Sequence, residues 1–260
     1  PKVTGEIVDA TSTTVKAKFA ANADAKGYAV CIFVEGKAKE QFEQFGPMMG
    51  LSNMGDMIKQ WGVQCTGEYT HEWTGLQPDT KYEIYVQAWD AAETYADMLV
   101  VPVTTKKLGG TGVAKVSIEI KEFAKSGDSY YQRVIYTPNS ECSVHRDIII
   151  EKNAYDKPEM GEEGVKNLLK EDREQDPYWN QYGVDNATWN ATPSTTYYAC
   201  SLAKNANDEW GPLEKVEFTT PAGEAGSKVA PTRIVQGTSK GVTQMPLTKA
   251  GKKQSDFQMI

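Results

Sequence analysis

Histidine and cysteine are scarce in this chain of 260 residues, which has two of the first and four of the second. The two histidines are too far apart in the sequence to suggest a His-based catalytic or zinc site. The cysteines are Cys31, Cys65, Cys142 and Cys200. They permit three pairings but are too few for a disulfide framework, so we expect mostly buried, unpaired thiols. We expect no metal and no cofactor.

Long apolar runs are also missing. No stretch approaches the roughly 20 apolar residues of a membrane helix. The first residues lack the charged and apolar regions of a signal peptide. We therefore expect no membrane span, and any lipid anchor is expected upstream of residue 1.

A basic face is not evident, because the formal net charge is −7. This charge argues against nucleic acid as a partner, since phosphate contacts need Lys and Arg. The exception is residues 221–260, which carry six Lys and Arg against two Asp and Glu. This basic tail either recruits an outside polyanion or lies back on the acidic body. We expect the second for residues 222–260.

Catalytic motifs are absent as well. The sequence has no GxSxG, HExxH or phosphate-binding loop. Carboxylate pairs occur throughout, but without a cleft they identify nothing. The acidic residues around 159–176 lack the DxDxDG spacing of a calcium loop and are expected to be a solvated helix face. We predict no catalytic residue and do not expect an enzyme.

The chain is an internal duplication. The segment Pro78–Thr105 aligns without a gap on Pro193–Thr220 at a constant offset of 115 residues. Upstream, Gln60-Trp61-Gly62-Val63 is matched with Gln181-Tyr182-Gly183-Val184. The glycine-rich stretch between the copies, residues 106–112, is expected to be a short linker. The predicted domains are residues 1–106 and 113–221.

Each copy is expected to consist mainly of strands. Val15, Ala17 and Phe19 alternate with lysines, as in a half-buried strand. Tyr82, Ile84, Val86 and Ala88 form one face of a later strand. Short strands separated by turns are typical of a β-sandwich.

The pattern Leu76-x-Pro78-x-Thr80-x-Tyr82, with the strand that follows and Thr104-Thr105, resembles the last third of a fibronectin type III domain. Pro193-x-Thr195-x-Tyr197 with Thr219-Thr220 resembles it again. The resemblance implies two tandem fibronectin type III-like, immunoglobulin-like sandwiches of mainly β class. It also implies that the hydroxyls of Tyr82 and Tyr197 bond to nearby backbone. Tandem units of this kind also resemble the mature part of Gram-negative bacterial surface lipoproteins.

Both copies are longer than a minimal sandwich and carry a predicted helical insertion, near 37–61 and near 158–175. Met54, Met57, Ile58 and Trp61 recur at helical spacing after Ser52 or Asn53 as the cap. Pro158 suits the first turn of the second helix.

The strands indicate where these helices pack. Tyr28–Val34 is apolar at every position, and 148–150 behaves alike. A strand without alternation is covered on both faces. We expect each helix to lie on the outer face of the sheet that holds these strands.

The candidate ligand-binding residues are aromatic side chains at the ends of the insertions, with a neighbouring carboxylate: Trp179, Tyr178, Tyr182, Trp61 and Asp176. Exposed aromatic faces stack on sugar rings, and a carboxylate accepts hydroxyl bonds. The alternative is that these rings attach the helix to the sandwich. Likewise, the methionines between Met48 and Met57 are either an adaptable binding patch or the core beneath a helix.

These patterns favour a non-catalytic extracellular, cell-surface or periplasmic module that binds a glycan or an extracellular protein. One alternative is a structural spacer that presents other domains. The other is a glycan-processing hydrolase with an unrecognised carboxylate pair, which requires a concave pocket with two acids roughly 5–10 Å apart.

Overall fold

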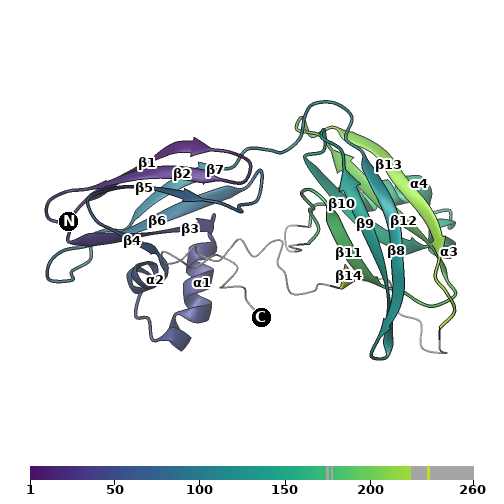
Figure 1. The fold of residues 1–260 in the computed structure, drawn as a ribbon, viewed down its shortest axis with the longest axis horizontal. Coiled ribbons are helices and arrows are strands. Elements are labelled where there is room, and N and C mark those ends of the chain that lie inside the picture. The colour runs from purple at the N-terminus through teal and green to yellow at the C-terminus, as the bar shows by residue number, and fades with distance from the viewer. Residues whose placement is uncertain (174–175, 177, 224–232, 235–260) are drawn as a thin grey trace. The chain divides into compact units, whose positions relative to one another are not determined.

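The computed structural model describes residues 1–173, 176, 178–223 and 233–234 (Figure 1). The chain forms two compact units: unit 1 is Pro1–Lys107, and unit 2 begins at Leu108. Each unit is a sandwich of two antiparallel sheets with short helices inserted. The expected fold class, mainly β with two fibronectin type III-like sandwiches, is confirmed. Most of the predicted tail, residues 222–260, lies outside the described residues.

Unit 1 has a three-stranded sheet in the order β1-β2-β5 and a four-stranded sheet in the order β4-β3-β6-β7. The strands are β1 (Val3–Ala10), β2 (Val15–Ala21), β3 (Gly27–Val34), β4 (Val63–Cys65), β5 (Glu68–Trp73), β6 (Lys81–Trp89) and β7 (Leu99–Thr104). The inner face of β2 carries Val15, Ala17 and Phe19, all fully buried, as their alternation predicts. They pack with Tyr28, Val30, Ile32 and Trp73 in the core between the two sheets.

Two helices, α1 (Lys37–Phe45) and α2 (Met54–Trp61), lie against the outer face of the sheet that contains β3 and β6 (Figure 1). A short 3-10 helix, η1 (Pro47–Met49), joins them. The α2 helix starts where predicted, because the Asn53 side chain accepts a bond from the Asp56 amide at 2.9 Å. Met57 and Ile58 are fully buried against Ala29, Cys31 and Phe33 of β3. The continuous apolar run of β3 therefore has cover on both faces.

Unit 2 repeats this arrangement. One sheet has the order β14-β11-β9-β8 and the other the order β10-β12-β13. The strands are β8 (Val116–Ser126), β9 (Ser129–Pro138), β10 (Val144–Glu151), β11 (Asp185–Asn190), β12 (Thr196–Lys204), β13 (Trp210–Thr219) and β14 (Arg233–Ile234). Val134, Tyr136, Tyr197 and Trp189 are among the residues that fill the core between these sheets.

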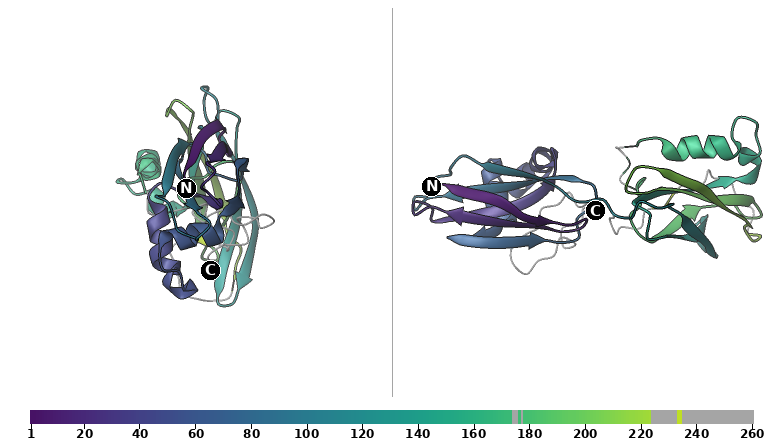
Figure 2. Two further views of the ribbon diagram at one scale, coloured as in Figure 1. Left: turned by 90° about the vertical axis from the view of Figure 1, so that its left-hand side faces the viewer. Right: turned by 90° about the horizontal axis from the view of Figure 1, so that it is seen from above.

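The helical insertion of unit 2 consists of α3 (Lys152–Tyr155) and α4 (Gly161–Lys170). Val165 and Leu169 of α4 are fully buried against Cys200 and Leu202 of β12, and α4 runs over the outer face of its sheet (Figure 2). Pro158 does not lie in the first helical turn as predicted. It follows Lys157 in a turn that the Met160 amide closes by donating to the Lys157 carbonyl at 3.0 Å, a position that the fixed φ of proline suits.

The glycine-rich stretch 106–112 is held from both sides. The Lys106 amide donates to the Thr11 carbonyl at 2.9 Å. The Gly112 amide donates to the Glu141 carboxylate at 2.7 Å, and the Asn205 side chain donates to the Gly112 carbonyl at 2.9 Å. Each unit therefore anchors its own end of this stretch, and the chain passes from one unit to the other between Lys107 and Leu108.

The two corner tyrosines form the same bonds in both units. The hydroxyl of Tyr82 accepts from the Gln77 amide, and that of Tyr197 accepts from the Thr192 amide, both at 2.9 Å. The closing threonines, Thr105 and Thr220, donate to the carbonyls of the same two residues at 2.6 Å. This confirms the backbone bonding that the family resemblance implies, at the predicted offset.

Removing either corner hydroxyl should destabilise its own unit. In Tyr82→Phe or Tyr197→Phe an amide loses its acceptor, which should lower the free energy of unfolding by about 1–3 kcal/mol. Urea denaturation, with amide hydrogen exchange to identify the affected unit, measures this. Tyr85→Phe is the matched control, because the Tyr85 hydroxyl donates to the Glu83 carboxylate at a partly exposed site. An equal loss in the control would contradict a special role of the corners.

Candidate functional site

The α4–β11 loop, residues 171–184, carries most of the predicted binding residues. It begins directly after α4, which ends at Lys170, and it ends directly before β11, which begins at Asp185. Residues 174, 175 and 177 lie outside the part of the chain that the structure describes. The loop lies next to β10 and the end of α4, on the side of the sheet that α4 covers.

Trp179 is buried, with 6% of its surface exposed. Its indole N–H donates to the Glu171 carbonyl at 2.8 Å. The guanidinium of Arg173 lies 3.9 Å from the ring centroid, and that of Arg146 lies 5.7 Å from it. Sugar stacking needs an open ring face, so this placement favours the alternative in which Trp179 attaches the loop to the sheet.

Trp61 is also buried, with 5% exposed. It packs against Phe45 at a centroid distance of 6.3 Å, in the apolar cluster between the two helices and the outer face of the sheet of unit 1.

The strand pairing also corrects the match of Trp61 with Tyr182. Cys65 pairs with Tyr28, and Gln181 pairs with His145, while Ala88 and Ala203 pair with the same two partners. Gln181 therefore corresponds to Cys65 and not to Gln60, so Trp61 and Tyr182 are not equivalent.

The other three candidates reach the surface. Asp176 is exposed, and Tyr178 and Tyr182 are half-buried. The Asp176 carboxylate accepts from the Tyr178 amide at 2.9 Å, and the Tyr178 carbonyl accepts from the Gln181 side chain at 2.5 Å. The loop thus leaves one carboxylate exposed and two tyrosines partly exposed, and the side chains of Asp176 and Gln181 hold the backbone at Tyr178.

Arg146 of β10 attaches this loop to the sheet through hydrogen bonds. Its side chain is buried and donates to the carbonyls of Leu169 and Glu171 at 2.9 and 2.6 Å and to the Asn180 side chain at 2.9 Å. Burial lowers the pKa of the guanidinium, and the Asp172 carboxylate opposes this shift. Arginine remains charged even so, so these three acceptors receive charge-assisted bonds.

The sequence reasoning missed Arg146. The signal was present, because three consecutive polar residues, His145-Arg146-Asp147, precede the apolar positions 148–150 of one strand. A buried strand accommodates such residues only where each has a partner.

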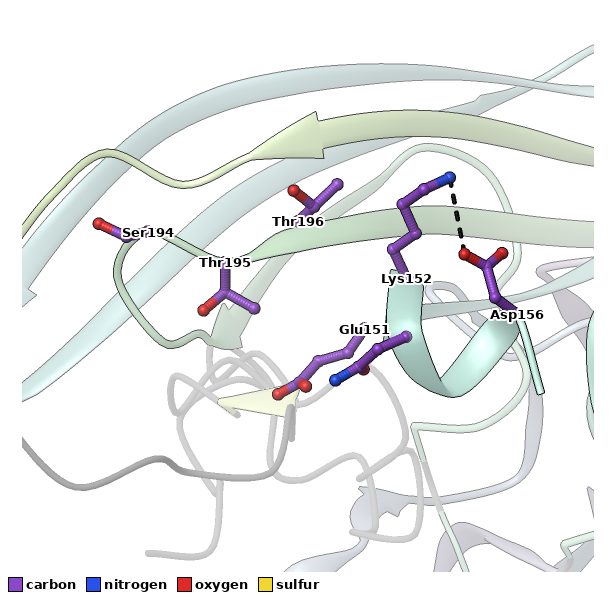
Figure 3. Close-up of a pocket in the computed structure, with 7 residues that line it drawn as sticks. Glu151, Lys152, Asp156, Ser194, Thr195 and Thr196 are labelled. Atoms are coloured by element: carbon purple, nitrogen blue, oxygen red, sulfur yellow. Dashed lines mark ion pairs between the residues drawn. The ribbon is translucent and has the colours of Figure 1, made fainter.

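A polar pocket of about 370 Å³ lies at one end of unit 2 (Figure 3). Its lining includes Glu151, Lys152, Asp156 and the turn Ser194–Thr196. Lys152 points toward Asp156, with 3.9 Å between the ammonium and the carboxylate, and also contacts Glu217 at 3.1 Å. An ammonium shared between carboxylates is the arrangement of a surface ion-pair network, and it differs from the buried acid that a glycosidase needs.

The four cysteines are free and buried, as expected. Burial raises the pKa of the Cys65, Cys142 and Cys200 thiols to about 12, so they are poor nucleophiles at neutral pH. In the described part of the chain, no group of three or more His, Cys, Asp or Glu side chains is placed to hold a metal ion.

Replacing Arg146 should release the loop. In Arg146→Met the carbonyls of Leu169 and Glu171 lose their donor, so the free energy of unfolding should fall by about 3 kcal/mol. Amides of the α4–β11 loop should also lose protection in hydrogen exchange. Arg173→Met is the control, because Arg173 stacks on the same indole from a partly exposed position and should cost less than about 1 kcal/mol. Equal effects would contradict the assigned role of Arg146.

No protein-family model matches this sequence, and no curated protein matches it. Solved structures are similar at low identity. A two-domain fibronectin type III segment of chicken tenascin is 11% identical, with 84% of this chain and 98% of that chain covered and a TM-score of 0.28. The FN1–FN3 domains of chicken CNTN1 are 14% identical, with 82% and 62% covered and a TM-score of 0.24.

Fibronectin(III)-like modules of Clostridium thermocellum CbhA are 14% identical, with 85% of this chain and 95% of that chain covered and a TM-score of 0.26. None of the helices in the described residues is long and apolar enough to cross a membrane. The sheet order, the paired corner bonds and the ladder register given above make this chain a tandem of two fibronectin type III-like sandwiches.

Proposed function

We propose that this chain is a non-catalytic module that acts outside the cytoplasm and presents the α4–β11 loop to a glycan or an extracellular protein. The observation that carries the proposal is that Arg146 bonds to described parts of this loop while other side chains of the loop reach the surface. Arg146 bonds to the Glu171 carbonyl at the start of the loop and to the Asn180 side chain further along it, while Asp176, Tyr178 and Tyr182 reach the surface. Rigid tyrosines supply contact area and a hydroxyl at low entropic cost.

The place of action is part of the same proposal. Modules of the fibronectin type III family commonly serve in extracellular display, and a lipid anchor upstream of this chain would suit a cell-surface or periplasmic role.

Met48 and Met49 of η1, which are 74% and 46% exposed, form a second candidate patch on unit 1. Met57 belongs to the core, so only part of the methionine group remains as a candidate contact.

A spacer is the second candidate, favoured by the path of the chain. In unit 1, Val3 pairs with Ala21 at one end of β1, whereas Lys106 bonds to Thr11 beside the other end. In unit 2, Pro221 bonds to Ser194, at the end of the sandwich opposite the start of β8 at Val116. In each unit the strands from the first to the closing one therefore begin at one pole and end at the other, and β14, later in the chain, pairs with β11 of unit 2. This path suits a spacer.

A glycan array and a pull-down from extracellular material, both with the full chain, test the proposal. Tyr178→Ala combined with Tyr182→Ala should weaken any binding about 30-fold, the size of an interface hot spot. Tyr69→Ala is the control, because Tyr69 of β5 is 37% exposed on unit 1 and lies outside both candidate surfaces, so this variant should leave binding unchanged. Blank results in both assays with folded protein would instead support the spacer.

A further inference from the structure

Both sandwiches attach the same turn to the core through a ring at the same strand position. In unit 1 the Tyr28 hydroxyl donates to the Gly67 carbonyl at 3.3 Å. In unit 2 the Nε2 atom of His145 lies 2.8 Å from the Gly183 carbonyl. The ladders make these residues equivalent, because Gly67 and Gly183 each lie two residues after the partner of the ring. Both glycines have a left-handed backbone, with φ of 62° and 86°.

The two bonds differ in their protons. The Gly183 carbonyl only accepts, so Nε2 of His145 must carry a hydrogen. The other ring nitrogen, Nδ1, lies 2.9 Å from the Asp147 carboxyl oxygen Oδ1. That second bond needs a hydrogen on Nδ1 or on Asp147. The pair therefore holds one proton more than a neutral imidazole beside a carboxylate.

The surroundings retain this proton. His145 and Asp147 have no exposed side-chain surface, and the Ser201 hydroxyl donates to the same Asp147 oxygen at 2.6 Å. Burial by itself lowers the pKa of His145, but Asp147, the Gly183 carbonyl and Asp185 of β11 together raise it above its usual value.

Two further groups lie nearby, Tyr136 of β9 and Cys142. Burial raises the pKa of the Tyr136 hydroxyl well above its usual value and that of the Cys142 thiol to about 12. Both stay neutral around pH 7, so the proton of the cluster is shared between the imidazole and the Asp147 carboxyl.

Unit 1 has an apolar set at the equivalent positions. The residues that correspond to His145, Asp147 and Ser201 are Tyr28, Val30 and Val86. Burial raises the pKa of the Tyr28 hydroxyl further above neutrality. The bond to Gly67 therefore does not change its proton content near pH 7, whereas the bond to Gly183 does.

We propose that the bond from His145 to Gly183 is a pH-sensitive attachment of the α4–β11 loop, closed while the His145–Asp147 pair keeps its extra proton and opened when that proton leaves. Once the proton passes to water, the buried Asp147 carboxylate retains the remaining ring hydrogen, because an unpartnered buried charge costs more than a lost carbonyl bond. Nε2 then carries no hydrogen, and its lone pair faces the Gly183 carbonyl oxygen. The two atoms repel, so the hydrogen bond that attaches the loop at Gly183 is lost.

The direction follows from the raised pKa. A histidine with a raised pKa in the closed state contributes stability that is fully present below its open-state pKa of about 6.5. That contribution is lost as the pH rises through the closed-state value. The attachment is thus firm in mild acid and weaker in mild alkali, whether or not the loop binds a partner.

Amide hydrogen exchange on the full chain between pH 5 and 9 tests this. The Gln181 amide, which donates to the His145 carbonyl at 2.9 Å, reports on the loop. Its ratio of open to closed states should rise about tenfold per pH unit from about pH 6.5 to the closed-state pKa, since one proton leaves per opening. The Cys65 amide of unit 1 should show no such slope. A flat response at Gln181 would overturn the proposal.

A combined variant, His145→Tyr with Asp147→Val and Ser201→Val, installs the set of unit 1 and should abolish the slope. Persistence of the slope in the folded variant would overturn the proposal. Tyr28→Phe is the reverse control and should loosen the turn at Gly67 equally at every pH.

If the combined variant fails to fold, imidazole NMR on the unaltered chain decides. The pKa values of the two histidines should be shifted in opposite directions. The pKa of His145 should lie above its usual value, and that of His71 below it because burial lowers the pKa of His71. A His145 midpoint at or below about 6.5 would overturn the proposal.

Discussion

One constraint governs both units: the sheet that contains β3 and β6, or β10 and β12, has apolar side chains on both faces. A β-sandwich buries only one face of each sheet, so the second face must be covered by something else. The inserted helices provide this cover, with Met57 and Ile58 in unit 1 and Val165 and Leu169 in unit 2. The loops that follow the helices are then brought to the surface beside the lids, where the candidate contacts lie.

The two copies share this frame but differ in what they place inside it. Unit 1 fills the position beside the glycine turn with Tyr28, whose hydroxyl bonds to Gly67, and with valines that only pack. Unit 2 places an ionisable cluster and the buried Arg146 on the same strand segment, facing opposite sides of the sheet. Through the bonds of His145 and Arg146, these groups tie the loop to the sheet at Gly183, Glu171 and Asn180.

Local sequence patterns predicted much of the frame. Alternation located β2 and β6, the lack of alternation in β3 predicted the covering helices, and Asn53, one of the two proposed caps, caps α2. The candidate site was less predictable. A short motif matched Trp61 to Tyr182. The strand pairing shows instead that Cys65 corresponds to Gln181, because the insertions of the two units differ in length. Aromatic content also could not distinguish a half-buried Tyr178 from a buried Trp179, since both rings suit either role.

The sequence by itself determined the repeat, the corner tyrosines and the need for a cover over one sheet, because these depend on residue type and local periodicity. Only the tertiary structure decided which side chains meet across the chain. His145 and Gly183 are 38 residues apart, and Arg146 and Leu169 are 23 apart. No local pattern encodes such pairs, because they arise when strand register and lid packing bring distant segments to one place.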